Sequence, residues 1–377
     1  MRKIKILFAG GGSAGHIFPI IAVVREMRRL GLDWQFFYAG PRDDFGSFLL
    51  SQEGVKIKTI MAGKIRRYFS IKSTLQNILD IFILAPLGFL QSFVYVFFLA
   101  PDLIFSKGGY GSLATVISGW FLGIPLLLHE SDIAPGLANK IAGKLVSKIF
   151  VSFPLAQTEY FSEKKMILVG NPIRREILAG SREKAKALFD LTCEKPVALI
   201  LGGSQGAQKI NDTILEILPQ MLADFELIHQ TGEKNLEQVI AEANVVMQTE
   251  LKKYYHPIGF LKEIELREAY AAADIIISRA GSGGIFEIAA CHKPSILIPM
   301  TLAAQNHQVK NAYAYGDTGA SLVIEEANLT PHFLLEKMKR LFAEQHQLHK
   351  MSEKAAAFAK PESAKTIAEF IMNSLIK

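Results

Sequence analysis

A glycine-rich turn at residues 10–16 is the feature that most constrains the fold of this chain. It runs from Gly10 to His16 and contains four glycines. An apolar run at residues 4–9 leads into it, and residues 17–27 carry apolar side chains at helical spacing. This order predicts a strand, a turn and a helix, whose first N–H groups and positive dipole end favour anions. His16 adds an acid–base group at the mouth of the turn, although a lone histidine is more often structural.

The same pattern recurs later in the chain, which predicts two domains. Strand-like and helix-like segments alternate throughout, as in parallel sheets flanked by helices. After residue 170 the pattern restarts, and an apolar run at 196–201 leads into a second glycine turn at 202–207. We therefore predict an α/β protein with two Rossmann-like domains in tandem, residues 1–165 and 166–360. The sequence does not decide whether the last helix, within 361–377, packs back on the first domain.

Composition narrows the class of protein. Two cysteines, Cys193 and Cys291, are too few for a disulfide framework and suggest a reducing cytoplasm. The apolar run near the N-terminus is too short for a signal peptide, so we do not expect secretion.

Charge is unevenly distributed along the chain. Residues 1–170 carry 19 Lys and Arg against 11 Asp and Glu, and the remainder carries 23 against 25. A basic half is typical of proteins that meet anionic lipid, phosphates or nucleic acid. We expect no nucleic-acid partner, because no basic stretch interleaves with aromatic residues.

An apolar stretch at residues 78–100 is long enough to span a bilayer. Polar or helix-breaking residues interrupt it at Asp80, Pro86, Gly88 and Gln91. It is preceded by four basic residues, Lys64, Arg66, Arg67 and Lys72. A buried helix pair and a surface patch that touches anionic lipid remain equally open, and a spanning helix is less favoured.

Several kinds of chemistry lack the motif that they require. The chain has no Asp-x-Asp pair, no cluster at metal-ligand spacing and no phosphate loop of the Gly-Lys-Ser/Thr type. No nucleophile elbow stands at a strand-to-helix turn. The second predicted strand runs into Gly40 rather than an acidic residue, which disfavours a nicotinamide cofactor. We therefore expect neither a metal nor a cofactor.

Two further stretches offer groups that can hold a nucleotide sugar. A third glycine turn at residues 279–286 is followed by Glu287. Its backbone N–H groups suit a diphosphate, and Glu287 either accepts from ribose hydroxyls or is a solvated carboxylate at a helix start. Residues 305–308 combine amides with an imidazole, which either bind sugar hydroxyls or form an ordinary polar helix start.

Together these motifs resemble the MurG family, the bacterial N-acetylglucosaminyltransferases of peptidoglycan synthesis. The resemblance covers essentially the whole chain, and the motifs occur in the family's order. They are residues 10–19, Lys107 to Tyr110, His129 with Glu130, Gly170 to Arg174, Gly202 to Ala207, Arg279 to Gly281 with Glu287, and Asn306 to Gln308 with Asn311.

The resemblance implies a GT-B fold with a cleft between the two domains. It implies UDP-N-acetylglucosamine as donor and lipid I, the undecaprenyl-diphosphate-linked muramyl pentapeptide, as acceptor. The muramyl C4 hydroxyl would attack with inversion at the sugar carbon and give lipid II, without a metal. The protein would lie peripherally on the cytoplasmic face of the bacterial membrane, against anionic lipid. A glycolipid synthase or a UDP-N-acetylglucosamine 2-epimerase of the same fold is the alternative.

The resemblance also assigns roles to residues. His16 would be the general base, with Glu130 in support. The donor would be bound by Ser13, Ala14, Gly15, Asp132, Arg174, Ser204, Gln205, Gly206, Leu261, Ser282, Gly283, Gly284, Ile285, Glu287 and Gln308. The acceptor would be bound by Gly11, Gly12, Gly108, Gly109 and Tyr110.

The chain departs from the family pattern at two places. Ser13, Ala14 and Gly15 stand where Thr-Gly-Gly is usual, so a Cβ is added to the turn. Ser131 and Asp132 stand where Gln-Asn is usual. A carboxylate accepts hydrogen bonds but does not donate them, which bears on the choice of donor sugar.

Overall fold

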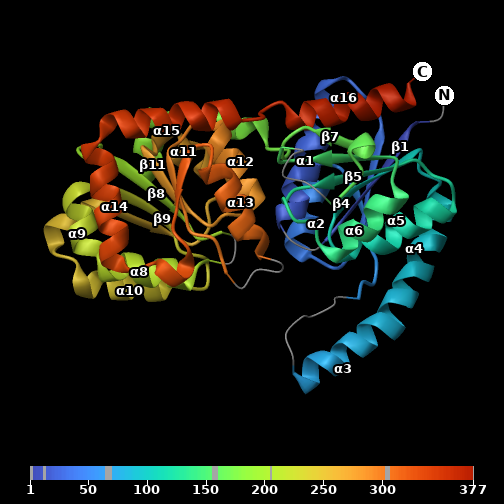
Figure 1. The fold of residues 1–377 in the computed structure, drawn as a ribbon, viewed down its shortest axis with the longest axis horizontal. Helices are drawn as coiled ribbons and strands as arrows, with labels where there is room; N and C mark the ends of the chain where they lie inside the picture. The colour runs from blue at the N-terminus through green and yellow to red at the C-terminus, as the bar shows by residue number, and fades with distance from the viewer. Residues whose placement is uncertain are drawn as a thin grey trace. The chain divides into compact units, whose positions relative to one another are not determined.

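The computed structural model describes residues 3–11, 14–63, 70–154, 160–203, 206–301 and 306–376, without the side chains of residues 14, 71 and 72. The chain divides into two compact units (Figure 1). The first comprises Met1–Arg174 with Pro361–Lys377, and the second comprises Arg175–Lys360.

The first unit is built on a seven-stranded parallel sheet in the order β3-β2-β1-β4-β5-β6-β7. The strands are β1 (Lys5–Gly10), β2 (Gln35–Gly40), β3 (Lys56–Thr59), β4 (Leu103–Gly108), β5 (Leu126–Glu130), β6 (Lys148–Val151) and β7 (Met166–Leu168). The α-helices are α1 (Ala14–Arg29), α2 (Asp44–Gln52), α3 (Ile71–Leu79), α4 (Ala85–Leu99), α5 (Leu113–Phe121), α6 (Leu137–Leu145) and α16 (Ser363–Leu375). A π-helical segment, η1 (Asp80–Leu84), joins α3 to α4, and a 3₁₀ turn, η2 (Tyr110–Ser112), follows β4.

The second unit has a six-stranded parallel sheet in the order β10-β9-β8-β11-β12-β13. The strands are β8 (Val197–Leu201), β9 (Glu226–Gln230), β10 (Tyr255–Ile258), β11 (Ile275–Ser278), β12 (Ser295–Leu297) and β13 (Ser321–Val323). The α-helices are α7 (Arg182–Phe189), α8 (Gln208–Glu216), α9 (Leu218–Asp224), α10 (Leu236–Val246), α11 (Glu263–Ala272), α12 (Ser282–Ala290), α13 (His307–Gly316), α14 (Pro331–Ala343) and α15 (Gln345–Phe358). Two parallel-sheet units confirm the predicted α/β class.

The central strands are largely apolar because helices cover both faces of each sheet. All residues of β8 are buried, as are all residues of β4. Strand β4 nevertheless ends in polar residues, Ser106 and Lys107, at the carboxyl edge where α/β folds bind ligands.

The boundary between the units lies later than the sequence predicted. Strand β7 pairs in parallel with β6, with Met166 opposite Ile149 and Leu168 opposite Val151. Residues 166–174 therefore belong to the first unit, and not to the second. The prediction placed the boundary before this strand, because a three-residue edge strand has no clear periodicity.

The last helix belongs to the first unit, where it packs on α1. Ile367 and Ile371 are fully buried in the cluster that contains Ile20 and Phe150. The ring of Phe370 meets that of Phe150 edge to face, with centroids 5.2 Å apart. The C-terminal segment thus completes the core on this face of the first sheet.

The helical arm, defined here as α3, η1 and α4, is mostly exposed. Figure 1 shows α3 extending away from the rest of the first unit. Ser73–Leu99 is long and apolar enough to cross a membrane by length and composition, and only 17% of its most apolar window is buried. The structure therefore excludes the interpretation of this stretch as a buried helix pair. The base of the arm packs closely, since a Cβ at Gly88 would lie 1.9 Å from the Met61 carbonyl oxygen.

We expect Ile367→Ala to lower the free energy of unfolding of the first unit by about 2–5 kcal/mol, since it leaves a cavity in the core. Denaturant unfolding followed by tryptophan fluorescence measures this, because both tryptophans, Trp34 and Trp120, lie in the first unit. The exposed Thr366→Ala on the same helix is the control and should stay within about 0.5 kcal/mol of wild type. An equal loss in both variants would contradict the packing of α16 described above.

Candidate functional site

Two glycine turns meet at the carboxyl ends of β1 and β4, beside His16. The Gly11 N–H donates to the Gly108 carbonyl oxygen at 2.9 Å. A Cβ at Gly109 would lie 2.9 Å from His16 Nε2 and 3.2 Å from Gly11 Cα. Only a residue without a side chain fits there, and its φ of +82° also favours glycine. The structure thus brings together His16, Gly11, Gly108 and Gly109, which the sequence placed about 95 residues apart.

The imidazole of His16 is half-buried in the first turn of α1. Burial, reinforced by the positive charge of Lys107, lowers the pKa of His16 to about 3. The ring is therefore neutral at pH 7 and able to accept a proton. This pKa value lies well below the ordinary histidine pKa of 6.5.

A pair of opposite charges is buried behind this turn. Lys107 and Glu130 lie at the carboxyl ends of the adjacent strands β4 and β5, and both residues are at most 3% exposed. The Lys107 ammonium donates to Ser131 Oγ, and the Asp132 N–H donates to Glu130 Oε1 at 2.9 Å. Burial lowers the pKa of Lys107 while the two carboxylates oppose that shift. Burial, followed by the Asp132 charge, raises the pKa of Glu130.

Asn139, on α6, connects this carboxylate to the glycine turn. Its Nδ2 donates to Glu130 Oε2 at 2.6 Å, and its Oδ1 accepts from the Gly109 N–H at 3.1 Å. A Cβ at Gly108 would lie 2.3 Å from Asn139 Nδ2, so the amide fills the space beside the turn. The sequence analysis missed Asn139, because its partners lie 9 and 30 residues away and no spacing rule links them.

Two more predicted residues, Arg174 and Tyr110, lie in the first unit. Arg174 is buried, with its guanidinium carbon 4.0 Å from the ring centroid of Phe18 on α1. His129 Nε2 lies 2.9 Å from the Gly170 carbonyl oxygen. This hydrogen bond connects the segment before Arg174 to the carboxyl end of β5. Tyr110, in η2, is 37% exposed.

The glycine turn of the second unit is held by side chains of the neighbouring strand β9. Gln230 Nε2 donates to the Gly203 carbonyl oxygen at 3.0 Å, and its Oε1 accepts from the Leu261 N–H at 3.2 Å. Gly206 has a φ of +78°, and a Cβ there would lie 2.5 Å from the Thr231 carbonyl oxygen. The Gln230 amide thus bonds both to the turn and to Leu261, which lie at the same edge of the sheet.

Helix α12 begins at this edge of the second sheet. Its N-cap is Gly281, which provides no side-chain cap, and its first turn contains Ser282, Gly283 and Gly284. Such a helix start suits a diphosphate. Glu287 follows one turn later, and the Tyr270 hydroxyl donates to its Oε2 at 3.2 Å. This bond orients the carboxylate, so Glu287 is not simply a solvated side chain.

Gln308 and Ile285 complete the predicted donor residues that the structure describes. Gln308, in the first turn of α13, accepts from the Met300 N–H at 3.0 Å. Ile285 is fully buried, so its backbone is the part available to a ligand. Gly12, Ser13, Ser204 and Gln205 lie outside the described residues, as does the side chain of Ala14. Gly15, which follows, is exposed at the start of α1.

Within the described part of the chain, no group of three or more His, Cys, Asp or Glu side chains is arranged to hold a metal ion.

Comparisons with known proteins agree with these motifs. The glycosyltransferase family 28 N-terminal domain matches residues 6–151, and the C-terminal domain matches residues 197–367. A protein of Bacillus cereus is 39% identical over 338 residues, which are 89% of this chain and 91% of that protein. A Clostridium kluyveri protein is 36% identical over 353 residues, covering 93% and 95%. Both are named UDP-N-acetylglucosamine--N-acetylmuramyl-(pentapeptide) pyrophosphoryl-undecaprenol N-acetylglucosamine transferase, with the number 2 added for the Bacillus protein.

Solved structures show the same fold. The crystal structure of Acinetobacter baumannii MurG superposes with a TM-score of 0.73 at 22% identity, covering 98% of this chain and 99% of that one. A UDP-GlcNAc 2-epimerase from Neisseria meningitidis superposes with a TM-score of 0.67 at 15% identity, covering 98% and 100%. The fold is therefore GT-B, and the chain belongs to the MurG group of glycosyltransferase family 28.

Proposed function

We propose that this protein transfers N-acetylglucosamine from UDP-N-acetylglucosamine to the muramyl C4 hydroxyl of lipid I, giving lipid II for peptidoglycan. The supporting observation is that relatives named for this reaction match about nine-tenths of the chain at 36–39% identity. Their names favour it over the glycolipid synthase and the epimerase. An epimerase would also convert the nucleotide sugar without any acceptor, so incubation with the donor alone separates the two.

The chemistry is a displacement with inversion at the anomeric carbon. The acceptor hydroxyl attacks that carbon, the bond from carbon to the UDP oxygen breaks, and the hydroxyl proton passes to the His16 imidazole. His16 is a weak base in the free chain, because burial and Lys107 favour its neutral form. A diphosphate bound at the adjacent glycine turn would raise its pKa, since a nearby negative charge stabilises imidazolium. Binding of the acceptor would thus activate the base.

The leaving UDP is stabilised by backbone donors of the second unit. The first turn of α12 offers N–H groups and the positive end of a nine-residue helix. Glu287, oriented by Tyr270, would accept from the ribose hydroxyls. We propose that these groups take the role a divalent ion has in other glycosyltransferases. Transfer of labelled sugar to a short-chain lipid I analogue, with and without chelator, tests the reaction and this feature together.

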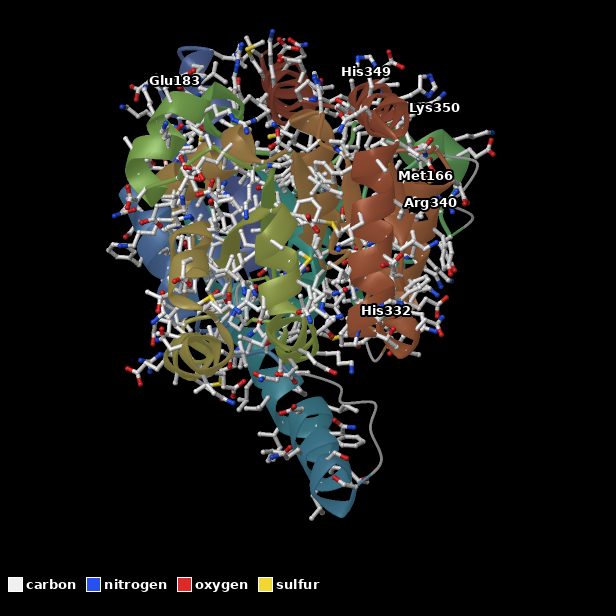
Figure 2. The ribbon with its side chains drawn as sticks, turned by 90° about the vertical axis from the view of Figure 1, so that its left-hand side faces the viewer. Met166, Glu183, His332, Arg340, His349 and Lys350 are labelled. Atoms are coloured by element: carbon white, nitrogen blue, oxygen red, sulfur yellow. The ribbon has the colours of Figure 1, made fainter. Side chains whose placement is uncertain are left out.

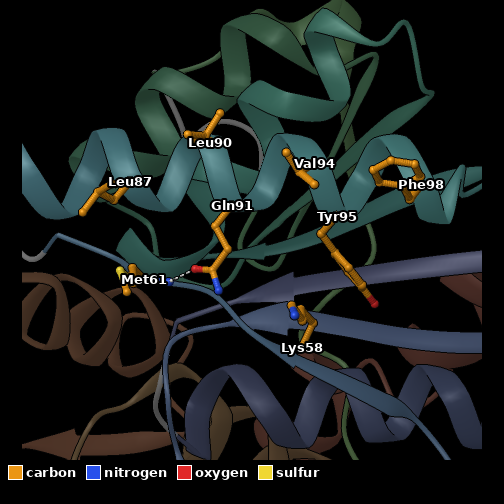
Figure 3. A pocket seen from close by; sticks show the side chains of 8 residues that line it. All are labelled: Lys58, Met61, Leu87, Leu90, Gln91, Val94, Tyr95 and Phe98. Carbon is orange, nitrogen blue, oxygen red and sulfur yellow. Dashed lines mark hydrogen bonds between the residues drawn. The ribbon is translucent and has the colours of Figure 1, made fainter.

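We propose that the helical arm places the protein on the cytoplasmic leaflet. Eleven of its large apolar residues are exposed, namely Leu75, Ile78, Leu79, Ile81, Phe82, Ile83, Leu87, Leu90, Val94, Phe97 and Phe98. A groove of about 570 Å³ lies between α4 and β3 (Figure 3). It is lined by Leu87, Leu90, Gln91, Val94, Tyr95 and Phe98 of α4 together with Lys58 and Met61. The arm's apolar surface suits acyl chains, and Lys56 and Lys58, both exposed on β3, suit anionic headgroups.

Replacing His16 by Ala should cut turnover by roughly 10²–10⁴-fold, the usual contribution of a general base. The affinity for UDP should change less than about twofold, because His16 lies in the first unit and the backbone N–H groups proposed to bind UDP lie in the second. Steady-state kinetics and calorimetry measure the two quantities. His332→Ala, at an exposed histidine of α14 (Figure 2), is the control. Unchanged turnover in the His16 variant would remove this residue from the role of base.

Replacing Glu287 by Gln should weaken UDP binding by about 10- to 100-fold, because hydrogen bonds to a charged group are worth roughly 1.5–3 kcal/mol. Uridine diphosphate titrated by calorimetry measures the loss. The matched control is Glu336→Gln, on the exposed face of α14, which should bind UDP as wild type does. Equal affinities in the two variants would exclude Glu287 from the nucleotide site.

The double variant Phe82→Asn, Phe98→Asn should reduce binding to vesicles containing anionic lipid by about 10- to 100-fold. These side chains are 72% and 79% exposed, and each buries apolar surface in the bilayer. Co-sedimentation with vesicles measures binding, and the Phe48→Asn variant, at an exposed residue of α2, is the control. Equal binding by both variants would contradict the proposed surface. Protein that resists extraction at high pH would indicate a spanning helix instead.

A further inference from the structure

Asn139 links the buried Glu130 carboxylate to the backbone of the glycine turn beside His16. Its Nδ2 donates a hydrogen bond to Glu130 Oε2 at 2.6 Å, and its Oδ1 accepts one from the Gly109 N–H at 3.1 Å. Asn139 is 7% exposed, so these bonds are shielded from solvent. Its amide therefore acts as a fixed spacer between strand β5 and the turn after β4.

Glu130 determines which way this amide faces. Glu130 Oε1 accepts from the Asp132 N–H, and Oε2 of the ionised carboxylate also only accepts, so it selects the NH₂ side of Asn139 as its partner. The carbonyl side is then directed at the Gly109 N–H, where an acceptor is required. Reversal of the amide would place two acceptors together at Glu130 and two donors together at Gly109. The carboxylate thus acts on the turn through Asn139, without touching it.

The turn needs such an external constraint. Gly108 and Gly109 both have a positive φ, +86° and +82°, and consecutive glycines have little conformational preference of their own. The Gly108 carbonyl accepts from the Gly11 N–H, and the Gly108 N–H donates to Ser106 Oγ at 3.1 Å. The Gly109 carbonyl accepts from the N–H and the Oγ of Ser112 at 3.1 and 2.9 Å, so the Gly109 N–H is the group whose partner comes from Asn139. Loss of the Asn139 carbonyl would free the N–H of Gly109, which is the residue that lies against the imidazole.

Lys107 lowers the free-energy cost of burying the Glu130 carboxylate. An isolated charge at 3% exposure would destabilise the fold, whereas an adjacent buried ammonium offsets much of that penalty. Lys107 precedes Gly108 directly, and Glu130 lies at the end of the neighbouring strand. Asp132 adds a further negative charge that favours the ionised Lys107. The whole group lies at the carboxyl end of β4 and β5, immediately behind the turn.

We propose that Asn139 is a positioning residue, which, oriented by Glu130, fixes Gly109 and through it both the acceptor diphosphate site and the imidazole of His16. Glu130 then supports the reaction indirectly, by orienting Asn139, and does not itself contact the substrate. The part of this inference that concerns catalysis rests on the proposed function, whereas the part that concerns the turn does not.

The first test measures the turn directly by hydrogen exchange of the Gly109 amide. Asn139→Ala removes its acceptor, so exchange at Gly109 should speed up by at least about tenfold, in keeping with one lost hydrogen bond of roughly 1–1.5 kcal/mol. Ser92→Ala is the control, because it removes a buried hydrogen bond to Thr115 elsewhere in the same unit. Gly109 exchange that is the same in wild type and the Asn139 variant would overturn the proposal.

The second test separates positioning from general damage. With a lipid I analogue, Asn139→Ala should raise the KM for the acceptor and lower kcat, each by about tenfold or more, while the UDP affinity stays within about twofold. A parallel loss of UDP affinity and of thermal stability would show general unfolding and overturn the proposal. If wild type itself transfers no sugar to lipid I, the proposed function fails, and the exchange experiment still decides the role of Asn139.

A double-mutant cycle tests whether Glu130 acts through Asn139. Glu130→Gln keeps the shape but removes the charge that orients the amide. If both residues act on one turn, the variant that combines Glu130→Gln with Asn139→Ala should be no slower than the slower single variant. Additive losses in kcat would show that Glu130 has a separate role and would overturn the chain of contacts proposed here.

Discussion

The first unit depends on the close approach of two backbone turns that carry no side chains. Gly11 and Gly109 come from different strands, and a single added Cβ at Gly109 would lie within 3.2 Å of Gly11. This approach is possible because β1 and β4 are neighbours in the sheet, so their carboxyl ends emerge side by side. The imidazole of His16 fills the remaining space. Every other feature of this edge, from the buried lysine to the amide of Asn139, supports or surrounds that contact.

Both units hold a glycine turn with a buried amide side chain. In the first unit the amide is that of Asn139, which reaches Gly109 from α6. In the second it is that of Gln230, which reaches Gly203 from β9. Glycine turns gain their freedom from missing side chains and therefore need contacts from elsewhere to adopt one conformation. A side-chain amide suits this task because it has a donor and an acceptor on opposite sides of one rigid plane.

Burial, together with the buried charge of Lys107, lowers the pKa of His16. Lys107 lies beneath the turn and opposes a second positive charge on His16, while burial acts in the same direction. The same ammonium stabilises Glu130, which in turn orients Asn139. One lysine therefore affects both the shape of the turn and the proton affinity of the ring within it. An incoming anion would change the second effect without disturbing the first.

The sequence predicted the α/β class, the two repeated strand–turn–helix starts and most of the strands, because these follow from local periodicity and glycine placement. It missed β7, β10 and β13, which are short edge strands defined by their pairing with β6, β9 and β12. It also left open whether the helical arm is buried or exposed, because a helix buried in a core and a helix facing a membrane have the same apolar sequence pattern.

For the site, the sequence alone determined which residues have the chemistry: an imidazole, two carboxylates and three glycine turns at the ends of apolar runs. Only the tertiary structure decided how they act together. It placed Gly109 against His16, gave Glu130 a partner in Asn139, and lowered the proton affinity of the imidazole by burying it beside Lys107. The physical reason is that composition and spacing describe a residue's own groups, whereas pKa, orientation and hydrogen-bond partners depend on neighbours that are distant in the chain.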